Sequence, residues 1–370
     1  MVTPTIKFTD TERPEFYKEV RKRVNKYFND TGISRHANFA MVFKTIFMIA
    51  LYLVPFALIL TSVVTSPWLV ILMWCIMGFG MAGIGLSVMH DANHGAYSKN
   101  QKVNRFVGVI LAFCGGFPAN WRIQHNVLHH SFTNIEEYDE DIEKGVMRFT
   151  PNQRRRKIFK YQIFYAPILY GILTLYWVLI KDYEQLVNYK KKNLLAGQGL
   201  TFRSALAQVI FQKVLYFGLI LALPIWLLSI PLWTIIVGFI AMHFIAGMAL
   251  ALIFQSAHVL QETEFYVADE NGCVDNDWAI HQMKTTSNFA RTNVPLTWFI
   301  GGLNYQVEHH LFPNICHVHY PAISKIVKAT AEEFNVPYHE HKTFTAALKS
   351  HFTLLNQLGT GKYDELHPAT

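Results

Sequence analysis

Charged side chains are scarce in this sequence. Only 16% of the 370 residues are Asp, Glu, Lys or Arg, and 51% are hydrophobic, whereas about 25% of the residues in a soluble domain are charged. The deficit argues against a soluble domain and predicts a membrane protein. The net charge of +7 then indicates membrane topology and lipid contact first, and an acidic protein partner second. We expect no nucleic-acid partner.

Cysteine is also scarce. The four cysteines, Cys75, Cys114, Cys273 and Cys316, are scattered without CxxC spacing. They offer neither a disulfide framework nor a thiolate metal site, which fits a reducing, cytoplasm-facing site. The first 30 residues contain no short apolar core of the kind that marks a cleavable signal peptide.

Four long apolar runs fill much of the chain. A helix needs about 20 apolar residues to cross a bilayer, and runs of about that length lie at 45–64, 68–89, 211–230 and 232–254. Thr65, Ser66 and Pro67 alone separate the first two runs, and Pro231 separates the last two. We therefore predict an all-α integral membrane protein with four transmembrane helices in two hairpins. Small residues in the second run, Gly78, Gly80, Gly83 and Gly85, predict close helix packing.

Basic residues predict the orientation. The turns inside both hairpins are uncharged, whereas cations cluster at 99–105, 154–157 and 190–192. The positive-inside rule places these clusters and both termini in the cytoplasm, in the inner membrane if the host is a bacterium. The run 106–117 is too short to span, and 163–180 is aromatic with basic flanks. We expect both to lie in the membrane interface.

Three regions follow from these patterns. Residues 1–38 form a basic segment with helical periodicity from Arg13 to Phe28, either on the membrane surface or as a solvated helix. Residues 39–345 form the main domain, in which interfacial helices and a cytoplasmic helical cap follow the spans. Residues 346–370 form a cytoplasmic tail.

Histidines gather where the apolar runs end. HDANH contains His90 and His94, HNVLHH contains His125, His129 and His130, and QVEHHLFP contains His309 and His310. With four spans, all three clusters fall on the cytoplasmic side. His258, about one turn beyond the fourth run, is an eighth candidate. These positions predict one shared metal centre.

The spacing suggests how the ligands divide. His90 and His94 are i and i+4, so on an α-helix they share a face. His125 and His129 share a face in the same way, and His130 is rotated by about 100°, which suits a second metal. Gln306, three residues before His309, could ligate through its amide oxygen or hold a water or an imidazole.

The type and number of the candidate ligands limit which metals can bind. Imidazole donors suit Fe, Cu, Zn or Ni, and eight neutral ligands exceed what one ion holds. Zinc has no redox chemistry, so a two-metal redox site beside lipid suggests two iron ions and dioxygen. A b-type cytochrome is an alternative. A haem, however, needs only one histidine pair within facing spans, whereas these histidines lie at the ends of the spans. A metal transporter would place ligands at mid-membrane, where only His243 lies.

The sequences around the three histidine clusters resemble the motifs of a known protein family. HDANHGAYS, HNVLHHSFTN and GGLNYQVEHHLFPNICHVHYP resemble the three histidine boxes of membrane fatty acyl desaturases. Gln in the third box and the run HQMKTTSNFA are similar to the front-end subgroup, above all to bacterial-type Δ6 acyl-lipid or linoleoyl-CoA desaturases. That subgroup inserts a double bond between an existing one and the carboxyl end. A di-iron lipid hydroxylase or acetylenase carries the same histidine set and remains an alternative.

The resemblance implies a fold, a ligand set and an electron source. It implies four transmembrane helices under a cytoplasmic cap, with a bent tunnel for the acyl chain of a membrane lipid or coenzyme A thioester. It implies that two irons are bound by His90, His94, His125, His129, His130, His258, His309 and His310. Many front-end desaturases carry a fused cytochrome b5 domain with a His-Pro-Gly-Gly motif, which this sequence lacks. We therefore expect a separate ferredoxin or cytochrome b5 as the electron donor.

Other polar residues are candidates for supporting roles. Those expected to hold the imidazoles in place are Asp91, Asn134, Asp139, Asn304 and Glu308. Trp278, Gln282 and Thr286 are candidates for the tunnel mouth. We expect His243 to be structural, and His281 to be either a support or a surface residue. The remaining histidines toward the C-terminus, among them His351, are expected to be ordinary cytoplasmic residues.

Overall fold

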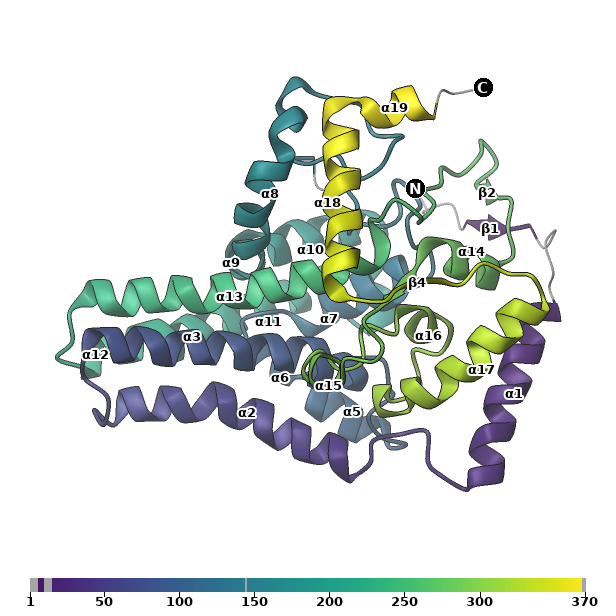
Figure 1. Cartoon of the computed structure of the whole chain (residues 1–370). Helices are drawn as coiled ribbons and strands as arrows, with labels where there is room; N and C mark the ends of the chain where they lie inside the picture. The colour runs from purple at the N-terminus through teal and green to yellow at the C-terminus, as the bar shows by residue number, and fades with distance from the viewer. Residues whose placement is uncertain (1–5, 10–14, 144, 368–370) are drawn as a thin grey trace. The chain divides into compact units, whose positions relative to one another are not determined.

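The computed structural model describes residues 6–9, 15–143 and 145–367, and the described residues are mostly helical (Figure 1). They divide into two compact units that interleave along the sequence. Unit 1 contains residues 38–123 and 168–251, and unit 2 contains the described residues of 4–37, 124–167 and 252–370. The described part of the N-terminal segment thus shares a unit with the C-terminal third of the chain, and the predicted domain boundaries stay predictions.

Unit 1 holds most of the apolar helices. Its elements are α2 (Phe39–Leu60), α3 (Pro67–Gly83), the π-helix η1 (Ile84–Val88), α4 (Met89–Asn93), α5 (Gln101–Gly108), α6 (Ile110–Phe113), α7 (Pro118–Arg122), α9 (Leu173–Tyr176), the π-helix η4 (Trp177–Lys181), α10 (Asp182–Lys191), the 3-10 helix η5 (Leu195–Gln198), α11 (Phe202–Phe217), the π-helix η6 (Gly218–Ala222) and α12 (Leu223–Leu227). Two helices, α8 (Gln162–Gly171) and α13 (Leu232–His258), contribute residues to both units.

Among the described residues, four helices are long and apolar enough to cross a membrane. They run over Phe39–Leu60, Pro67–Asn93, Phe202–Leu227 and Leu232–His258. Each overlaps one predicted span, so the prediction of a helical, multi-pass membrane protein is confirmed at this level. Two further pairs, Gln101–Phe113 with Pro118–His129 and Lys157–Gly171 with Leu173–Lys191, are bent by 114° and 60°. Counting each pair as one span would give six, so the interfacial placement of 106–117 and 163–180 stays a prediction.

The third span begins earlier than predicted. The sequence pattern places its start at 211, but the helix begins at Phe202, after a capping box in which the Thr201 side chain bonds Ser204. One cation lies near the start of the predicted span and is accommodated by tertiary contacts. Lys213 is buried and bonds Asp182 Oδ2 and the Gly115 carbonyl oxygen, each at 2.5 Å. Its charge is neutralised by a residue far away in sequence, so it does not end the helix.

Glycines permit close packing inside unit 1. A Cβ added at Gly80 would lie 2.6 Å from the backbone nitrogen of Tyr52, where α3 packs along α2. A Cβ at Gly78 would lie 2.7 Å from the Met242 carbonyl oxygen of α13. Both distances are too short for a real side chain, so the close helix packing predicted for the second span is confirmed at these two glycines.

Unit 2 combines the two ends of the chain. It contains β1 (Lys7–Phe8), α1 (Glu15–Thr31), the π-helix η2 (Ile123–His129, whose first residue belongs to unit 1), the 3-10 helix η3 (Lys157–Tyr161), β2 (Cys273–Val274), α14 (Trp278–Thr285), β3 (Ser287–Phe289), α15 (Val294–Phe299), α16 (Gln306–Leu311), the 3-10 helix η7 (His317–His319), α17 (Tyr320–Glu333), β4 (His339–His341), α18 (Phe344–Thr360) and α19 (Lys362–Leu366). Strands β1 and β2 pair in parallel, as do β3 and β4.

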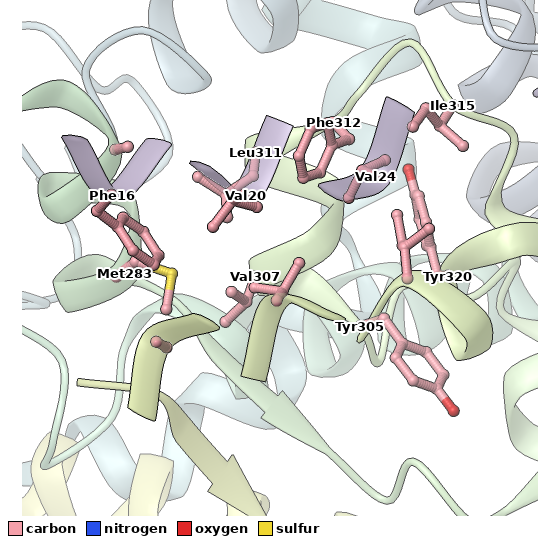
Figure 2. Packing of buried hydrophobic residues seen from close by; sticks show 14 of the residues in the cluster. Phe16, Val20, Val24, Met283, Tyr305, Val307, Leu311, Phe312, Ile315 and Tyr320 are labelled. Carbon is pink, nitrogen blue, oxygen red and sulfur yellow. The ribbon is translucent and has the colours of Figure 1, made fainter. Parts of the chain in front are cut away.

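Helix α1 is part of the core of unit 2. Phe16, Val20, Val24 and Phe28 recur every four residues, are buried, and share one cluster with α14, α16 and α17 (Figure 2). Outside this cluster, Arg23 of α1 forms a bidentate ion pair with Glu333 of α17, at 2.6 and 2.7 Å. The apolar face predicted to meet lipid or solvent is therefore covered by protein. The predicted start of this helix, Arg13, lies outside the described residues.

The C-terminal segment packs in the same way. His351 of α18 is buried, and its Nδ1 lies 2.8 Å from the Val259 carbonyl oxygen. Gln162 donates to the Leu355 carbonyl at 2.7 Å, and Arg148 pairs with Asp364 at 2.9 Å. Residues 346–367 thus pack within unit 2, and the assignment of this region as a cytoplasmic tail stays a prediction.

Candidate metal centre

Three buried histidines of unit 2 converge from three elements. His129 ends η2, His258 ends α13, and His310 lies on α16. Their ring centroids are 4.7 to 5.0 Å apart. One ring nitrogen from each lies within 4.8 Å of the others. We call His129, His258 and His310 the first triad.

Each imidazole of the first triad is held through its Nδ1 atom. His129 Nδ1 lies 3.0 Å from Asp139 Oδ2, His258 Nδ1 lies 3.3 Å from the Thr285 carbonyl oxygen, and His310 Nδ1 lies 2.7 Å from Gln282 Oε1. All three partners are acceptors, so each Nδ1 carries the proton and donates. The lone pair of each neutral ring then lies on Nε2, which is the arrangement a metal-binding histidine needs.

A second set of three histidines meets at the Nε2 atom of His130. This atom lies 3.3 Å from His125 Nε2 and 2.9 Å from His309 Nε2. The Nδ1 atom of His309 lies 3.1 Å from the Tyr320 hydroxyl. We call His125, His130 and His309 the second triad. The rings of His130 and His310 are stacked, with centroids 4.3 Å apart, so the two triads are adjacent in unit 2.

The grouping of the second box differs from the expectation for an α-helix. The spacing predicted that His125 and His129 act together and that His130 stands apart. Residues 123–129 instead form a π-helix, and the His130 amide bonds the His125 carbonyl five residues back at 2.9 Å. The wider turn brings His125 next to His130, with ring centroids 4.7 Å apart, while the rings of His125 and His129 still stack with centroids 5.3 Å apart. Which of these three histidines share a metal stays a prediction.

The first box belongs to unit 1. His90 lies on α4 and His94 caps it, and the His94 amide bonds the His90 carbonyl at 3.1 Å. Their ring centroids are 4.7 Å apart, and each ring meets Trp121 edge-on. The predicted i, i+4 pairing on one helical face is confirmed. Their role as metal ligands stays a prediction.

Two of the predicted supporting carboxylates contact histidines. Asp139 accepts from His129, as described, and also from the backbone amides of Asn134 and Asp141 at 3.0 Å each. Asp91 is buried, with Oδ1 3.9 Å from His90 Nδ1 in unit 1. Asn134 acts on the backbone, because its side chain donates to the carbonyl oxygens of His258 and Glu264 at 2.9 and 3.1 Å.

The remaining candidates have other partners. Asn304 donates to Thr297 Oγ1 at 2.8 Å and so braces a turn. Glu308 accepts from Asn288 and Tyr338, each at 2.9 Å, and its burial raises the pKa of its carboxyl to about 7. Gln306 is buried at the start of α16. Its predicted role as a ligand or support stays a prediction.

Gln282 has a more specific position than the sequence indicated. It was a candidate for the tunnel mouth, but its Oε1 atom accepts from both His310 and Thr133. Thr286 bonds the Gln282 carbonyl oxygen, and Trp278 packs edge-on against Tyr17 with centroids 5.5 Å apart. That these three line a tunnel stays a prediction.

Several supporting residues were not foreseen. Tyr320 and Thr133 contact triad histidines. His281, which the sequence left as either a support or a surface residue, is buried with Nε2 2.7 Å from the Thr133 carbonyl oxygen. Burial lowers the pKa of His281 to about 4, so this ring is neutral and donates to that carbonyl. Thr285 contributes only its carbonyl oxygen, which no sequence pattern reveals. His243, expected to be structural, bonds Tyr216 at 2.8 Å and Thr174 at 3.0 Å within unit 1.

The residues of unit 2 fit metal ions by their donor chemistry. Three imidazoles of the first triad have ring nitrogens close enough to share an ion, and their opposite nitrogens are tied to acceptors. Three more imidazoles meet at His130 Nε2. Imidazole nitrogen suits iron, copper, zinc or nickel. The geometry therefore supports a metal centre. The imidazole donors suit all four of these metals and do not by themselves select one.

Known proteins resemble this chain over nearly its whole length. The family model described as fatty acid desaturase matches residues 66–342. An sn-1 linoleoyl-lipid 6-desaturase of Synechocystis sp. is 38% identical over 96% of this chain and 98% of its own length. A second sn-1 linoleoyl-lipid 6-desaturase, from Arthrospira platensis, is 34% identical over 97% of this chain and 96% of its own. An acyl-lipid (8-3)-desaturase of Physcomitrium patens is 36% identical over 97% of this chain and 75% of its own.

Proposed function

The chain belongs to the fatty acid desaturase family, and we propose that it is a front-end, Δ6-like desaturase that introduces a cis double bond into an acyl chain of a membrane lipid. Membership in the family makes it an oxidoreductase. The front-end assignment is supported by relatives named as 6-desaturases and (8-3)-desaturases that align over almost the entire chain.

The observation that carries the proposal is the pair of histidine triads. We propose that they provide six of eight ligands to two iron ions, and that His90 and His94 of unit 1 provide the other two. Iron bound there would supply the oxygen-dependent oxidation of unactivated methylene carbons that desaturation requires. The family implies iron and oxygen use, and the number of ions rests on the number of imidazoles.

The side chains around the first triad prepare these ligands. Asp139, Gln282 and the Thr285 carbonyl hold the Nδ1 protons in place, so each ring offers Nε2 without having to change its tautomer. All three rings are at most 1% exposed, so the residues around them also exclude water, which limits side reactions during oxidation. The chemistry requires no side-chain acid or base at the C–H bond.

The membrane arrangement and partners form the rest of the proposal. The four apolar helices would form two hairpins, with both termini in the cytoplasm and the metal centre under a cytoplasmic cap, in the inner membrane of a bacterial host. Separate ferredoxin or cytochrome b5 would deliver the electrons. Trp278, Gln282 and Thr286 remain candidates for the mouth of an acyl tunnel.

The test is the fatty-acid profile of a host that expresses the chain and is fed linoleate, measured by gas chromatography and mass spectrometry. The wild-type chain should produce a new double bond on the carboxyl side of the existing one. His310→Ala should abolish the product, whereas His367→Ala, which alters an exposed histidine, should not. A hydroxylated fatty acid as the sole product would contradict desaturation, and a double bond on the methyl side would contradict the front-end assignment.

A further inference from the structure

A cavity of about 750 Å³ lies within unit 1. Residues of α5, α7, η5 and α11 surround it, together with the turn that follows α4. Its volume falls in the range of small-molecule sites. All of its lining residues belong to unit 1, whereas both triads belong to unit 2.

The lining is positively charged. Arg105 and Arg122 both line the cavity, and no Asp or Glu is among the described residues that do so. Arg122 is held by neutral amides only, with Nε 2.8 Å from Gln198 Oε1 and Nη1 3.1 Å from Asn93 Oδ1. Burial and the nearby charge of Arg105 both lower the pKa of the Arg122 guanidinium. Arg122 is half-buried and Arg105 is exposed, and no described carboxylate lines the cavity beside them.

Neutral hydrogen-bonding groups complete the lining. Gln101, Gln208 and Gln212 contribute amides, and the Gln212 Oε1 atom is buried without a hydrogen-bond partner among the described residues. Gly197 and Gly199 form part of the wall, so the backbone there is open to a ligand. This mixture of guanidinium and amide groups matches an anionic group that carries further hydroxyl or amine substituents.

The cavity also lies beside the first histidine box. Asn93 and Gly95, the residues on either side of His94, both line it. A group bound there would be anchored next to the end of α4. An enzyme that counts carbons from the carboxyl end of its substrate needs a polar anchor close to its metal ligands, and His94 is one of the ligands proposed above.

We propose that the cavity binds the phosphate of the acyl donor, so that the substrate is a phosphate-bearing acyl lipid or thioester and not a neutral glycolipid. The proposal rests on the proposed function for the identity of the acyl chain. Guanidinium groups bind phosphate through paired, charge-assisted hydrogen bonds. A neutral sugar headgroup would bring no counter-charge to the half-buried guanidinium of Arg122.

The test compares acyl donors with and without phosphate. The full-length, iron-loaded protein is reconstituted in nanodiscs and given linoleoyl phosphatidylglycerol, linoleoyl monogalactosyldiacylglycerol or linoleoyl-CoA. Arg105→Gln with Arg122→Gln removes both cavity charges. The matched control, Lys99→Gln with Lys102→Gln, removes two charges from exposed positions that do not line the cavity. Kinetics of desaturation and native mass spectrometry of bound lipid are both recorded.

The arginine variant should lose about tenfold or more in kcat/KM and in affinity for a phosphate-bearing donor, since charge-assisted hydrogen bonds of this kind are lost. Its kcat/KM on the galactolipid should change by less than about twofold, and the lysine control should match wild type. Whether phosphatidylglycerol or linoleoyl-CoA shows the loss identifies the source of the phosphate. Equal losses on all donors, or none, would overturn the proposal. If no donor is desaturated, the proposed function fails, and lipid binding still decides this inference.

Discussion

The Nδ1 atom of His129 lies 3.0 Å from Oδ2 of Asp139, ten residues further along the chain, and both side chains are completely buried. The carboxylate orients a ring that belongs to the first triad. Two backbone amides, those of Asn134 and Asp141, donate to the same carboxylate. The turn after η2 is therefore built around one acceptor, the Asp139 carboxylate, which fixes the tautomer of a histidine that we propose binds a metal.

Asp139→Asn should release the metal. Three donors face Asp139, and an amide has only one acceptor oxygen, so its NH2 group would oppose one of those donors. Loss of such an orienting partner typically costs 10- to 100-fold in metal affinity. Iron per chain, measured by plasma mass spectrometry after dialysis against a weak chelator, should fall accordingly. Asp30→Asn, which alters an exposed carboxylate paired with Lys26, should retain the wild-type content.

Two substitutions of Gln282 test whether an acceptor at Nδ1 also positions His310. Gln282→Met removes the acceptor for His310 and should lower iron affinity by about tenfold. Gln282→Glu keeps an acceptor oxygen, and its second oxygen replaces an Nε2 atom that has no hydrogen-bond partner among the described residues. The Glu variant should therefore retain iron. Equal retention by both variants would show that Gln282 does not position His310.

Gly80→Ala tests the packing of α2 on α3. The added Cβ would lie 2.6 Å from the Tyr52 nitrogen, and overpacking of this kind costs about 1–3 kcal/mol. The melting temperature in detergent should fall. Gly218→Ala is the matched control, because nothing lies within 4 Å of its new Cβ. A helical alanine there should be neutral or stabilise by up to about 1 kcal/mol. Equal melting temperatures for the two variants would contradict the packing.

His351 should make unit 2 sensitive to acid. Burial lowers the pKa of His351 to about 4, whereas an unfolded chain binds the proton near pH 6.5. As pH falls from about 6.5 to 4, only the unfolded state takes up this proton, so stability is lost in that window, by at most about 3 kcal/mol. His351→Asn keeps a donor for the Val259 carbonyl and should reduce this loss. Melting temperatures at about pH 7.5 and 5 should therefore differ less in the variant.

The spans could be predicted from the sequence because the length of an apolar run reports the thickness that it must cross. Their ends could not: the third begins at Phe202, after the cap at Thr201, and not at 211. Lys213 is buried inside this helix and bonds Asp182, 31 residues away. The face of α1 was similarly ambiguous, since an apolar stripe looks the same whether lipid or protein covers it. Phe16 and Val20 show that protein covers it here.

The histidines could be identified because their clustering at the ends of apolar runs is improbable by chance. Their grouping could not, because the change from an α- to a π-helix between Ile123 and His129 leaves no mark in residue spacing. Gln282 and Tyr320 orient triad rings from 28 and 11 residues away. Such partners depend on the folded arrangement of α14, α16 and α17 and have no local signature.

The iron content of the purified protein tests the central claim most directly. Protein prepared without added metal and with iron supplied during expression should contain about two irons per chain and little zinc or copper, as expected for eight imidazole ligands shared between two ions. Substituting His129 and His310 by Ala should remove the ion held by the first triad. Wild-type protein that contains no iron, or that binds iron equally well without the first triad, would contradict the account.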